Sequence, residues 1–303
     1  MLRRLRQFFE HRGFLEVETP ILSVDTVVDR HLDPVPVEIG GQRCWMQTSP
    51  EFGMKRLLAA DADRRPRAIF QITRAFRREE LGPLHNIEFT MVEWYRIGDG
   101  LDEGMQLLSD LGEEMLGRGP AERMSYRAAF ERHAGIDPHG IDAARLPDRC
   151  RELGITAPAS LAFGDRDGWL DLILAERVQS NLGRGRPAIV YDYPATQAAL
   201  ARVRPGSPPV AERFELYANG IELANGYHEL LDPAVLRRRN HENNVLRRAD
   251  GKAMLPEESR LLAAMEAGLP AMAGAALGFD RLVMVATGAE RLEQVLAFPF
   301  GRA

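Results

Sequence analysis

The order of strand-like and helix-like segments constrains the fold of this 303-residue chain more than any other feature. Strand-like runs come in neighbouring pairs, with 67–76 followed by 86–97 and a second pair within 211–230. Helical patterns are gathered in one block at about 100–185. A parallel βαβ unit of about 30 residues does not recur along the chain. This order predicts an α+β fold with a mainly antiparallel sheet flanked by helices, and a mainly helical insertion at about 100–185.

Shorter signals complete the expected order of elements. We expect a helix at about 2–12 and a hairpin around Gly40-Gly41. Ser49-Pro50 is typical of an N-cap followed by proline at the first helical position. A long charged helix is expected at 232–250, and a strand that runs into a helix at 274–282. Because the first helix is already under way at the start, the sequence is compatible with a natural start further upstream.

Composition narrows the classes of protein and the compartment. Hydrophobic residues make up 45% of the chain, which indicates a packed core, and the formal net charge of -5 argues mildly against a nucleic-acid scaffold. The two cysteines, Cys44 and Cys150, have no metal-ligand spacing and fit a reducing cytosol. No apolar run reaches the roughly 18 residues of a membrane span. We therefore expect a cytoplasmic protein without a membrane partner.

The stretch AFRREELGPLHNIEFTMVEWY, residues 75–95, combines charged and aromatic residues in a strand-loop-strand pattern. Side chains alternate along a strand, so Arg77 and Glu79 share a face. The returning strand places on one face Phe89, Met91, Glu93 and Tyr95. An arginine fork can bind a phosphate or carboxylate, an aromatic ring can stack on a base, and a carboxylate can bind an ammonium. The alternative is an amphipathic hairpin with a solvated charged face.

The stretch ERFELYANGIELANGYHE, residues 212–229, contains the strong hairpin signal Asn219-Gly220. If these two residues form the turn, Glu215 opposes Ala224, and Glu215 and Glu222 lie diagonally on one face. Two carboxylates so close need a cation between them, and Mg²⁺ with a triphosphate fits. The alternative is a pair of ordinary exposed glutamates.

The stretch GAALGFDRL, residues 274–282, places small residues before an apolar helix. Gly278 would allow a close approach of the backbone, and Arg281 near the helix start would be a second phosphate clamp. A helix that only packs on the sheet is the alternative.

Three segments of the chain resemble, in order, the signature motifs of class II aminoacyl-tRNA synthetases. GFLEVETP resembles motif 1 and ends at Pro20, FRREE with HNIEF resembles motif 2, and GAALGFDRL resembles motif 3. TSPE, HNIEFTMVEWY and RFELYANGIELANGYHEL are similar to the lysyl-tRNA synthetase catalytic domain. The resemblance implies one catalytic domain over 1–303, no anticodon-binding domain, and a homodimer in which Pro20 is structural.

The resemblance also implies a nucleotide and metal site. Arg77 and Arg281 would be the catalytic arginines on the ATP phosphates, Phe89 would stack on adenine, and Mg²⁺ would be held by Glu215 and Glu222. The implied ATP-binding residues are Arg77, Arg78, Glu79, His85, Asn86, Phe89, Glu222, Leu223, Gly278 and Arg281.

An amino-acid site follows from the same resemblance. Glu51 would bind the amino group near the substrate carboxylate, and the helix carrying Lys55 would support the site without chemistry of its own. The distal ammonium would be bound by Glu93, Tyr95 and Glu229. The implied substrate-binding residues are Ser49, Pro50, Glu51, Glu93, Tyr95, Asn225, Glu229 and Ala276.

One position departs from the motif 3 pattern of three alternating glycines, which here reads Gly274, Ala276, Gly278. The extra methyl group would crowd an α-amino group beside the carboxylate, whereas a β-amino acid could avoid it. We therefore predict that Ala276 disfavours α-lysine by about 1–3 kcal/mol.

Within this superfamily the chain resembles the family of elongation factor P–(R)-β-lysine ligases. The resemblance implies activation of (R)-β-lysine, or lysine, as an aminoacyl-adenylate with ATP and Mg²⁺. It implies elongation factor P, whose lysine side chain receives the aminoacyl group, as the partner, and no tRNA. The basic residues of 232–250 could guide this acceptor, or they could form a solvated surface.

Two other functions remain open at this point. A truncated lysyl-tRNA synthetase would charge tRNA, although the acidic balance and the expected lack of an anticodon-binding domain argue against it. A non-catalytic regulatory paralogue would bind an amino acid or a partner protein, although such paralogues typically lose the arginines of motifs 2 and 3, and Arg77 and Arg281 are both present.

Overall fold

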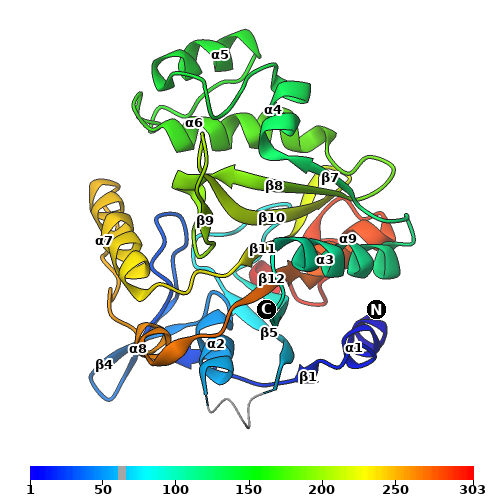
Figure 1. The fold of residues 1–303 in the computed structure, drawn as a ribbon, viewed down its shortest axis with the longest axis vertical. Helices are drawn as coiled ribbons and strands as arrows, with labels where there is room; N and C mark the ends of the chain where they lie inside the picture. Colours follow the sequence, from blue (N-terminus) through cyan, green and yellow to red (C-terminus); the bar gives the residue numbers. More distant parts are fainter. Residues whose placement is uncertain (61–65) are drawn as a thin grey trace. The chain divides into compact units, whose positions relative to one another are not determined.

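The computed structural model describes residues 1–60 and 66–303 (Figure 1). The chain divides into two compact units. Unit 1 comprises Met1–Gly100 with His228–Ala303, and unit 2 comprises Leu101–Tyr227. Unit 2 contains the predicted helical segment and also strands as far as Tyr227, because those strands pair with one another. The described part of the chain has no helix with the length and apolar character needed to cross a membrane.

Unit 1 is built on four strands in the order β1, β5, β6, β12, which are Leu15–Glu16, Ala68–Phe76, Glu88–Ile97 and Met272–Gly278. The short β1 pairs in parallel with β5, and the other pairs are antiparallel. This confirms the predicted α+β fold with a mainly antiparallel sheet. It also confirms that the two arms of the 67–97 segment pair with each other.

The two faces of this sheet differ in chemistry. On one face Phe70 and Trp94 pack against Phe9 of helix α1 (Leu2–Glu10), with ring centroids 4.7 and 5.2 Å away. Aromatic contacts of this kind anchor the helix on the sheet. On α1 the residues Leu5, Phe8 and Phe9 are buried, whereas Leu2 is exposed. The other face carries the polar residues that form the candidate site.

Helix α2 (Glu51–Ala59) begins one residue later than predicted, since Pro50 occupies the N-cap position. Ser49 Oγ still accepts the Glu51 amide at 3.0 Å, which satisfies one of the free donors of the first turn. The segment that precedes α2 forms a small sheet in the order β2, β4, β3, with the bounds Leu22–Ser23, Gln42–Met46 and Pro36–Ile39. The predicted hairpin turn at Gly40-Gly41 is present, and both residues have positive φ, at +59° and +81°.

Three helices complete unit 1. They are α7 (Pro233–Ala249), α8 (Arg260–Gly268), which packs against both α2 and α7, and α9 (Phe279–Thr287), which follows β12 directly (Figure 1). The charged helix and the strand-to-helix transition were both predicted. Asp232 caps α7 by accepting the Ala234 amide at 2.8 Å, and Pro233 follows it. Two short helical turns follow α9, at Leu292–Gln294 and Phe300–Arg302.

Unit 2 combines helices with a second set of strands. Its helices are α3 (Leu101–Leu116), α4 (Tyr126–Ala134), α5 (Leu146–Glu152) and α6 (Arg166–Ile173), with short turns at Ala143–Arg145, Leu174–Val178, Gln179–Asn181 and Ala195–Gln197. Its strands are β7 (Glu122–Ser125), β8 (Ala188–Pro194), β9 (Val203–Arg204), β10 (Val210–Ala218) and β11 (Ile221–His228). The order is β11, β10, β8, β7, with β9 also on β10. Buried residues such as Phe130 and Trp169 form its core.

Strands β10 and β11 form the predicted hairpin, with positive φ at Asn219 and Gly220. The register expected from this turn is confirmed next to it, where Tyr217 opposes Glu222, but it is wrong further along, because a bulge interrupts the ladder between Leu216 and Tyr217. Glu215 therefore opposes Asn225 instead of Ala224. A bulge adds one residue to one strand and shifts every later pair, which a turn signal alone cannot reveal.

Candidate functional site

Strand β6 forms the floor of the candidate site in unit 1. Phe89, Glu93 and Tyr95 share one face of the strand, as predicted from the alternation of side chains. The Cα atoms of Phe89 and Glu93 are about 13 Å apart along the strand, at about 3.3 Å per residue. An aromatic end and an acidic end therefore lie on one surface of the strand.

Arg77 lies at the aromatic end of this floor. Its guanidinium stands 5.1 Å from the Phe89 ring centroid, and Nη1 is 3.4 Å from Glu80 Oε1. Its Nε atom is buried and has no hydrogen-bond partner. A buried donor without a partner is costly, so this arginine is prepared to donate to a carboxylate or phosphate oxygen.

Arg281, in the first turn of α9, contacts the loop between β5 and β6 at Leu84 and His85. Its Nε donates to the Leu84 carbonyl at 3.1 Å, and its Nη2 lies 2.6 Å from His85 Nε2. Burial and the positive charge of Arg281 lower the pKa of His85. The imidazole is therefore neutral near pH 7 and can accept a hydrogen bond from the guanidinium at Nε2.

The loop 83–86 is held by the C-terminal part of unit 1 at further points. The Leu292 amide donates to the Pro83 carbonyl at 2.8 Å. The Phe300 amide donates to Asn86 Oδ1 at 3.0 Å, while Asn86 Nδ2 donates to the Glu88 carbonyl at 2.6 Å. The buried Asn86 side chain, predicted to bind the nucleotide, thus fastens the loop in this structure.

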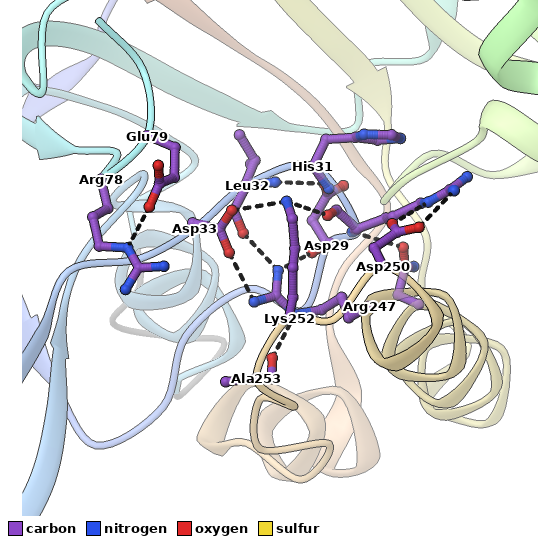
Figure 2. Close-up of polar contacts among 12 residues, drawn as sticks. Asp29, His31, Leu32, Asp33, Arg78, Glu79, Arg247, Asp250, Lys252 and Ala253 are labelled. Carbon is purple, nitrogen blue, oxygen red and sulfur yellow. Dashed lines mark hydrogen bonds and ion pairs between the residues drawn. The ribbon is translucent and has the colours of Figure 1, made fainter. Parts of the chain in front are cut away.

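The backbone of Arg78 is joined to an ion network that lies beside Arg78 and Glu79 (Figure 2). The Arg78 amide donates to the Asp33 carbonyl at 2.8 Å, and the Asp33 carboxylate accepts from Arg247 at 2.9 Å and from Lys252 at 2.8 Å. Although burial opposes its charge, Lys252 and Arg247 lower the pKa of Asp33. The exposed side chains of Arg78 and Glu79 pair with each other at 3.0 Å (Figure 2).

Strand β12 lies beside the floor and places the three motif 3 positions on its face. Gly274 pairs with Tyr95, and any Cβ there would overlap the tyrosine ring. Ala276 pairs with Glu93, so its methyl lies about 5 Å from the glutamate Cβ. A Cβ at Gly278 would meet nothing closer than 3.8 Å. The strict requirement for glycine is therefore at the first position.

The acidic end of the floor is a cluster of Glu51, Glu93, Glu229 and Lys55, which we call the carboxylate cluster. Glu93 accepts from Tyr95 Oη at 2.5 Å and from Ser49 Oγ at 2.7 Å. Lys55 Nζ donates to Glu51 Oε1 and to Glu229 Oε2, both at 2.5 Å. All four side chains are buried. The sequence placed three of them in one site and left Lys55 as support only.

The protonation of this cluster departs from that of exposed groups. Burial, together with the charge of Glu51, raises the pKa of Glu93 to about 7. Burial raises the pKa of Glu229 to about 8, although Lys55 opposes this. Burial acts against the charge of Lys55, but Glu229 and Glu51 outweigh it and raise its pKa. Three buried carboxylates share a single ammonium. Like charges in a buried site repel one another, and this repulsion raises the pKa values of the carboxyl groups.

An unsatisfied acceptor lies in the carboxylate cluster. Glu229 Oε1 is buried and has no hydrogen-bond partner. With all groups ionised, three carboxylates and one ammonium leave two negative charges uncompensated. A ligand carrying ammonium groups would compensate that charge and supply the missing donor.

Glu215, the first predicted metal ligand, lies in unit 2 and is heavily engaged. Its Oε2 accepts from Tyr193 Oη at 2.6 Å and also from Tyr217 Oη, while its Oε1 pairs with Arg213. A carboxylate has about four acceptor positions, so one position remains for a cation. Glu222 lies on the same face, opposite Tyr217.

These two carboxylates fit Mg²⁺ but not a metal held by protein alone. The described residues contain no group of three or more His, Cys, Asp or Glu arranged around a common metal position. Mg²⁺ commonly uses one or two carboxylates and completes its shell with phosphate and water oxygens. Glu215 and Glu222 match that requirement, and their role as metal ligands stays a prediction.

The other two predicted residues of unit 2 lie on β11. Leu223 is buried next to Glu222. Asn225 accepts from Arg213 Nε at 3.2 Å and donates to Tyr227 Oη at 2.7 Å. The Tyr227 hydroxyl therefore fixes the Asn225 amide, a role that phenylalanine could not take.

The structure assembles most of the predicted site within unit 1. The predicted residues found there are Ser49, Pro50, Glu51, Arg77, Arg78, Glu79, His85, Asn86, Phe89, Glu93, Tyr95, Glu229, Ala276, Gly278 and Arg281. Those in unit 2 are Glu215, Glu222, Leu223 and Asn225. Sequence reasoning missed the contacts of Lys55, Arg213 and Tyr193 with the carboxylates. Only the Glu51–Lys55 spacing of four residues on a helix could have indicated one of them.

Comparison with known proteins gives two consistent results. The family model described as tRNA synthetases class II (D, K and N) matches residues 1–302. Elongation factor P--(R)-beta-lysine ligase from Klebsiella pneumoniae subsp. pneumoniae is 45% identical over 309 residues, covering 100% of this chain and 94% of that protein. Proteins of the same name from Vibrio cholerae serotype O1 and Salmonella arizonae are 45% and 43% identical, with the same coverage.

Proposed function

Since the chain belongs to the family of class II tRNA synthetases (D, K and N), we propose that it is an ATP-dependent ligase that modifies elongation factor P. It activates (R)-β-lysine, or lysine, as an aminoacyl-adenylate. It then transfers the aminoacyl group to a lysine side chain of elongation factor P, the acceptor in the names of its relatives.

One observation carries this proposal. Among the buried polar atoms without a partner in the described part of unit 1, two belong to the candidate site, the donor Arg77 Nε and the acceptor Glu229 Oε1. Arg77 is stacked on Phe89 at one end of the floor, and Glu229 belongs to the carboxylate cluster with Glu93 at the other. A lysine isomer has a carboxylate for the first group and an ammonium for the second, so one ligand satisfies both.

The first step forms the adenylate. A substrate carboxylate oxygen attacks the α-phosphorus of ATP, and the bond to the bridging oxygen breaks as pyrophosphate leaves. The enzyme's contribution is to position the reactants and neutralise charge. Arg77 orients the carboxylate and the α-phosphate, and Arg281, oriented by His85, binds the terminal phosphates. Mg²⁺ held by Glu215 and Glu222 would supply further charge neutralisation on the phosphates.

The second step forms the amide. The ε-amine of the acceptor lysine attacks the activated carbonyl, the amine loses a proton, and AMP leaves with its bonding pair. The carboxylate cluster holds the distal ammonium of the substrate throughout, which keeps that amine from reacting. This arrangement places the activated carbonyl at the arginine end of the floor, away from the carboxylate cluster.

The proposal includes the setting of the enzyme. It acts in the cytoplasm as a homodimer, with Pro20 in the dimer interface, and does not use tRNA. Two basic residues of α7 contribute little to guiding the acceptor, because Arg237 pairs with Glu258 at 2.8 Å and Arg247 is buried with Asp33.

ATP–pyrophosphate exchange that depends on added (R)-β-lysine or lysine tests this function. We expect exchange with the wild type and about 100-fold less with Arg77→Ala, the loss typical of removing one donor to a developing anion. Arg74→Ala is the matched control, because Arg74 is an exposed arginine near the end of β5, three residues before Arg77, with surface contacts to Thr90 Oγ1 at 3.0 Å and to Glu88 at 3.5 Å. Absence of exchange with both amino acids would contradict the proposed function.

A further inference from the structure

Lys55 is an unusual residue in this chain. Of 39 lysine and arginine residues only two are lysine, Lys55 and Lys252. Lys55 is 1% exposed, and its ammonium lies between Glu51, one helical turn away, and Glu229, which lies 174 residues further along the chain. A compact ammonium with three donors can bridge two carboxylates at one point, whereas the broad fork of arginine needs more room.

The contacts of Lys55 divide the oxygens of the carboxylate cluster into two sets. One oxygen of Glu51 and one of Glu229 are bound to the ammonium. Glu229 Oε1 is left without a partner, and Glu93 is held by the neutral hydroxyls of Ser49 and Tyr95. Lys55 Nζ also lies 5.6 Å from the Tyr95 ring centroid, on the same side of the floor. The oxygens left for a ligand are therefore those that Lys55 does not bind.

We propose that Lys55 is a positioning residue that fixes the rotamers of Glu51 and Glu229, so that Glu229 Oε1 and Glu93 face the distal ammonium of the substrate. This inference rests on the proposed function and deepens it. Lys55 does not touch the reacting atoms. It determines which acceptors a lysine isomer finds, and its positive charge favours their ionised form.

The electrostatics give this role a direction. The titratable groups that face Glu93 and Glu229 are Glu51 and Lys55 on α2 and Tyr95 on β6, together with one another. The positive charge of Lys55 lowers the pKa of both glutamates, and the negative charge of Glu51 raises it. The neighbouring β5 and β12 positions paired with Glu93 are the uncharged Gln71 and Ala276.

Removing the positive charge of Lys55 and removing the negative charge of Glu51 should therefore have opposite effects. They should move the acid limb of the pH profile of kcat/KM in opposite directions. In Lys55→Met the two glutamates hold their protons to higher pH, so the acid limb of kcat/KM for the amino acid moves up by about one pH unit or more. In Glu51→Gln a negative neighbour is lost, and the limb moves down. A residue that only stabilised the fold would change the amount of active enzyme and leave the limb where it is.

The experiment measures exchange kinetics and amino-acid binding by calorimetry from about pH 6 to about pH 9. Lys252→Met is the matched control, since Lys252 also pairs with a buried carboxylate, Asp33, at 2.8 Å. We expect its limb to match the wild type. Lys55→Gln, which retains hydrogen bonding but not charge, replaces Lys55→Met if the methionine variant does not fold. If neither folds, Glu51→Gln decides the question.

The inference is overturned if the acid limb of kcat/KM does not move in a folded variant with an uncharged residue at position 55. It is also overturned if the limb does not move in Glu51→Gln. The proposed function then survives if the wild type still activates a lysine isomer. A wild type that binds and activates neither isomer overturns both, whereas one that binds without activating leaves the pH dependence of binding to decide the role of Lys55.

Discussion

Replacing Arg247 by methionine should destabilise unit 1 severely, because its guanidinium is buried in the ion network of Figure 2. Arg247 donates to Asp33 at 2.9 Å and to the carbonyls of Asp29, Leu32 and Ala253 at 2.8 to 3.0 Å. Without Arg247, Asp33 keeps only Lys252 as a cationic partner. The three carbonyls lose the donor that Arg247 supplies. Breaking a buried pair in this way costs about 3–5 kcal/mol.

The assay is urea unfolding followed by far-ultraviolet circular dichroism. Arg237→Met is the matched control, since Arg237 lies on the same helix and pairs with Glu258 and Glu266 at the surface. We expect a large fall in the urea midpoint for Arg247→Met and almost none for Arg237→Met, because exposed ion pairs contribute little. Equal effects of the two substitutions would refute the reasoning that burial decides the contribution.

Three further outcomes follow from the site. Because the folded pKa values of Glu93 and Glu229 are raised from 4.5 to about 7 and about 8, the folded ligand-free protein holds protons that the unfolded chain has lost, and its stability should fall progressively as pH rises from about 4.5 to about 8. Lysine should restore stability most at the alkaline end of this range. Thermal unfolding with and without lysine measures the effect at each pH, and a lysine effect that does not change with pH would contradict the prediction. Ala276→Gly should move the preference toward α-lysine by up to about 100-fold in relative kcat/KM, and an unchanged preference refutes the methyl argument. Asn86→Ala leaves the Phe300 amide unpaired and should raise KM for ATP about tenfold with KM for lysine unchanged; equal rises in both would argue against a local effect on the loop.

Local patterns predicted the elements that carry the site. Alternation placed Phe89, Glu93 and Tyr95 on one face of β6, and the pairing of β5 with β6 preserves that face. The small residues before Asp280 predicted the passage from β12 into α9, which the structure stabilises through the Thr90 amide donating to Asp280 Oδ2 at 2.7 Å. These features depend on periods of two and 3.6 residues, which the sequence displays directly.

Contacts between distant segments could not be predicted from such periods. The ion pair of Lys55 with Glu229 and the hydrogen bond from Phe300 to Asn86 join residues 174 and 214 positions apart. The bulge that pairs Glu215 with Asn225 depends on packing, not on the turn signal. Each depends on which segments meet in space, and no local pattern encodes that.

The measurement that tests the central claim most directly is the intact mass of purified elongation factor P. It is incubated with the enzyme, ATP, Mg²⁺ and either (R)-β-lysine or lysine, and a parallel reaction contains tRNA. We predict a mass gain of one lysyl unit on elongation factor P, larger with the β-isomer, and no charging of tRNA. An unchanged elongation factor P together with aminoacylated tRNA would contradict the account and assign the adenylate chemistry to tRNA charging instead.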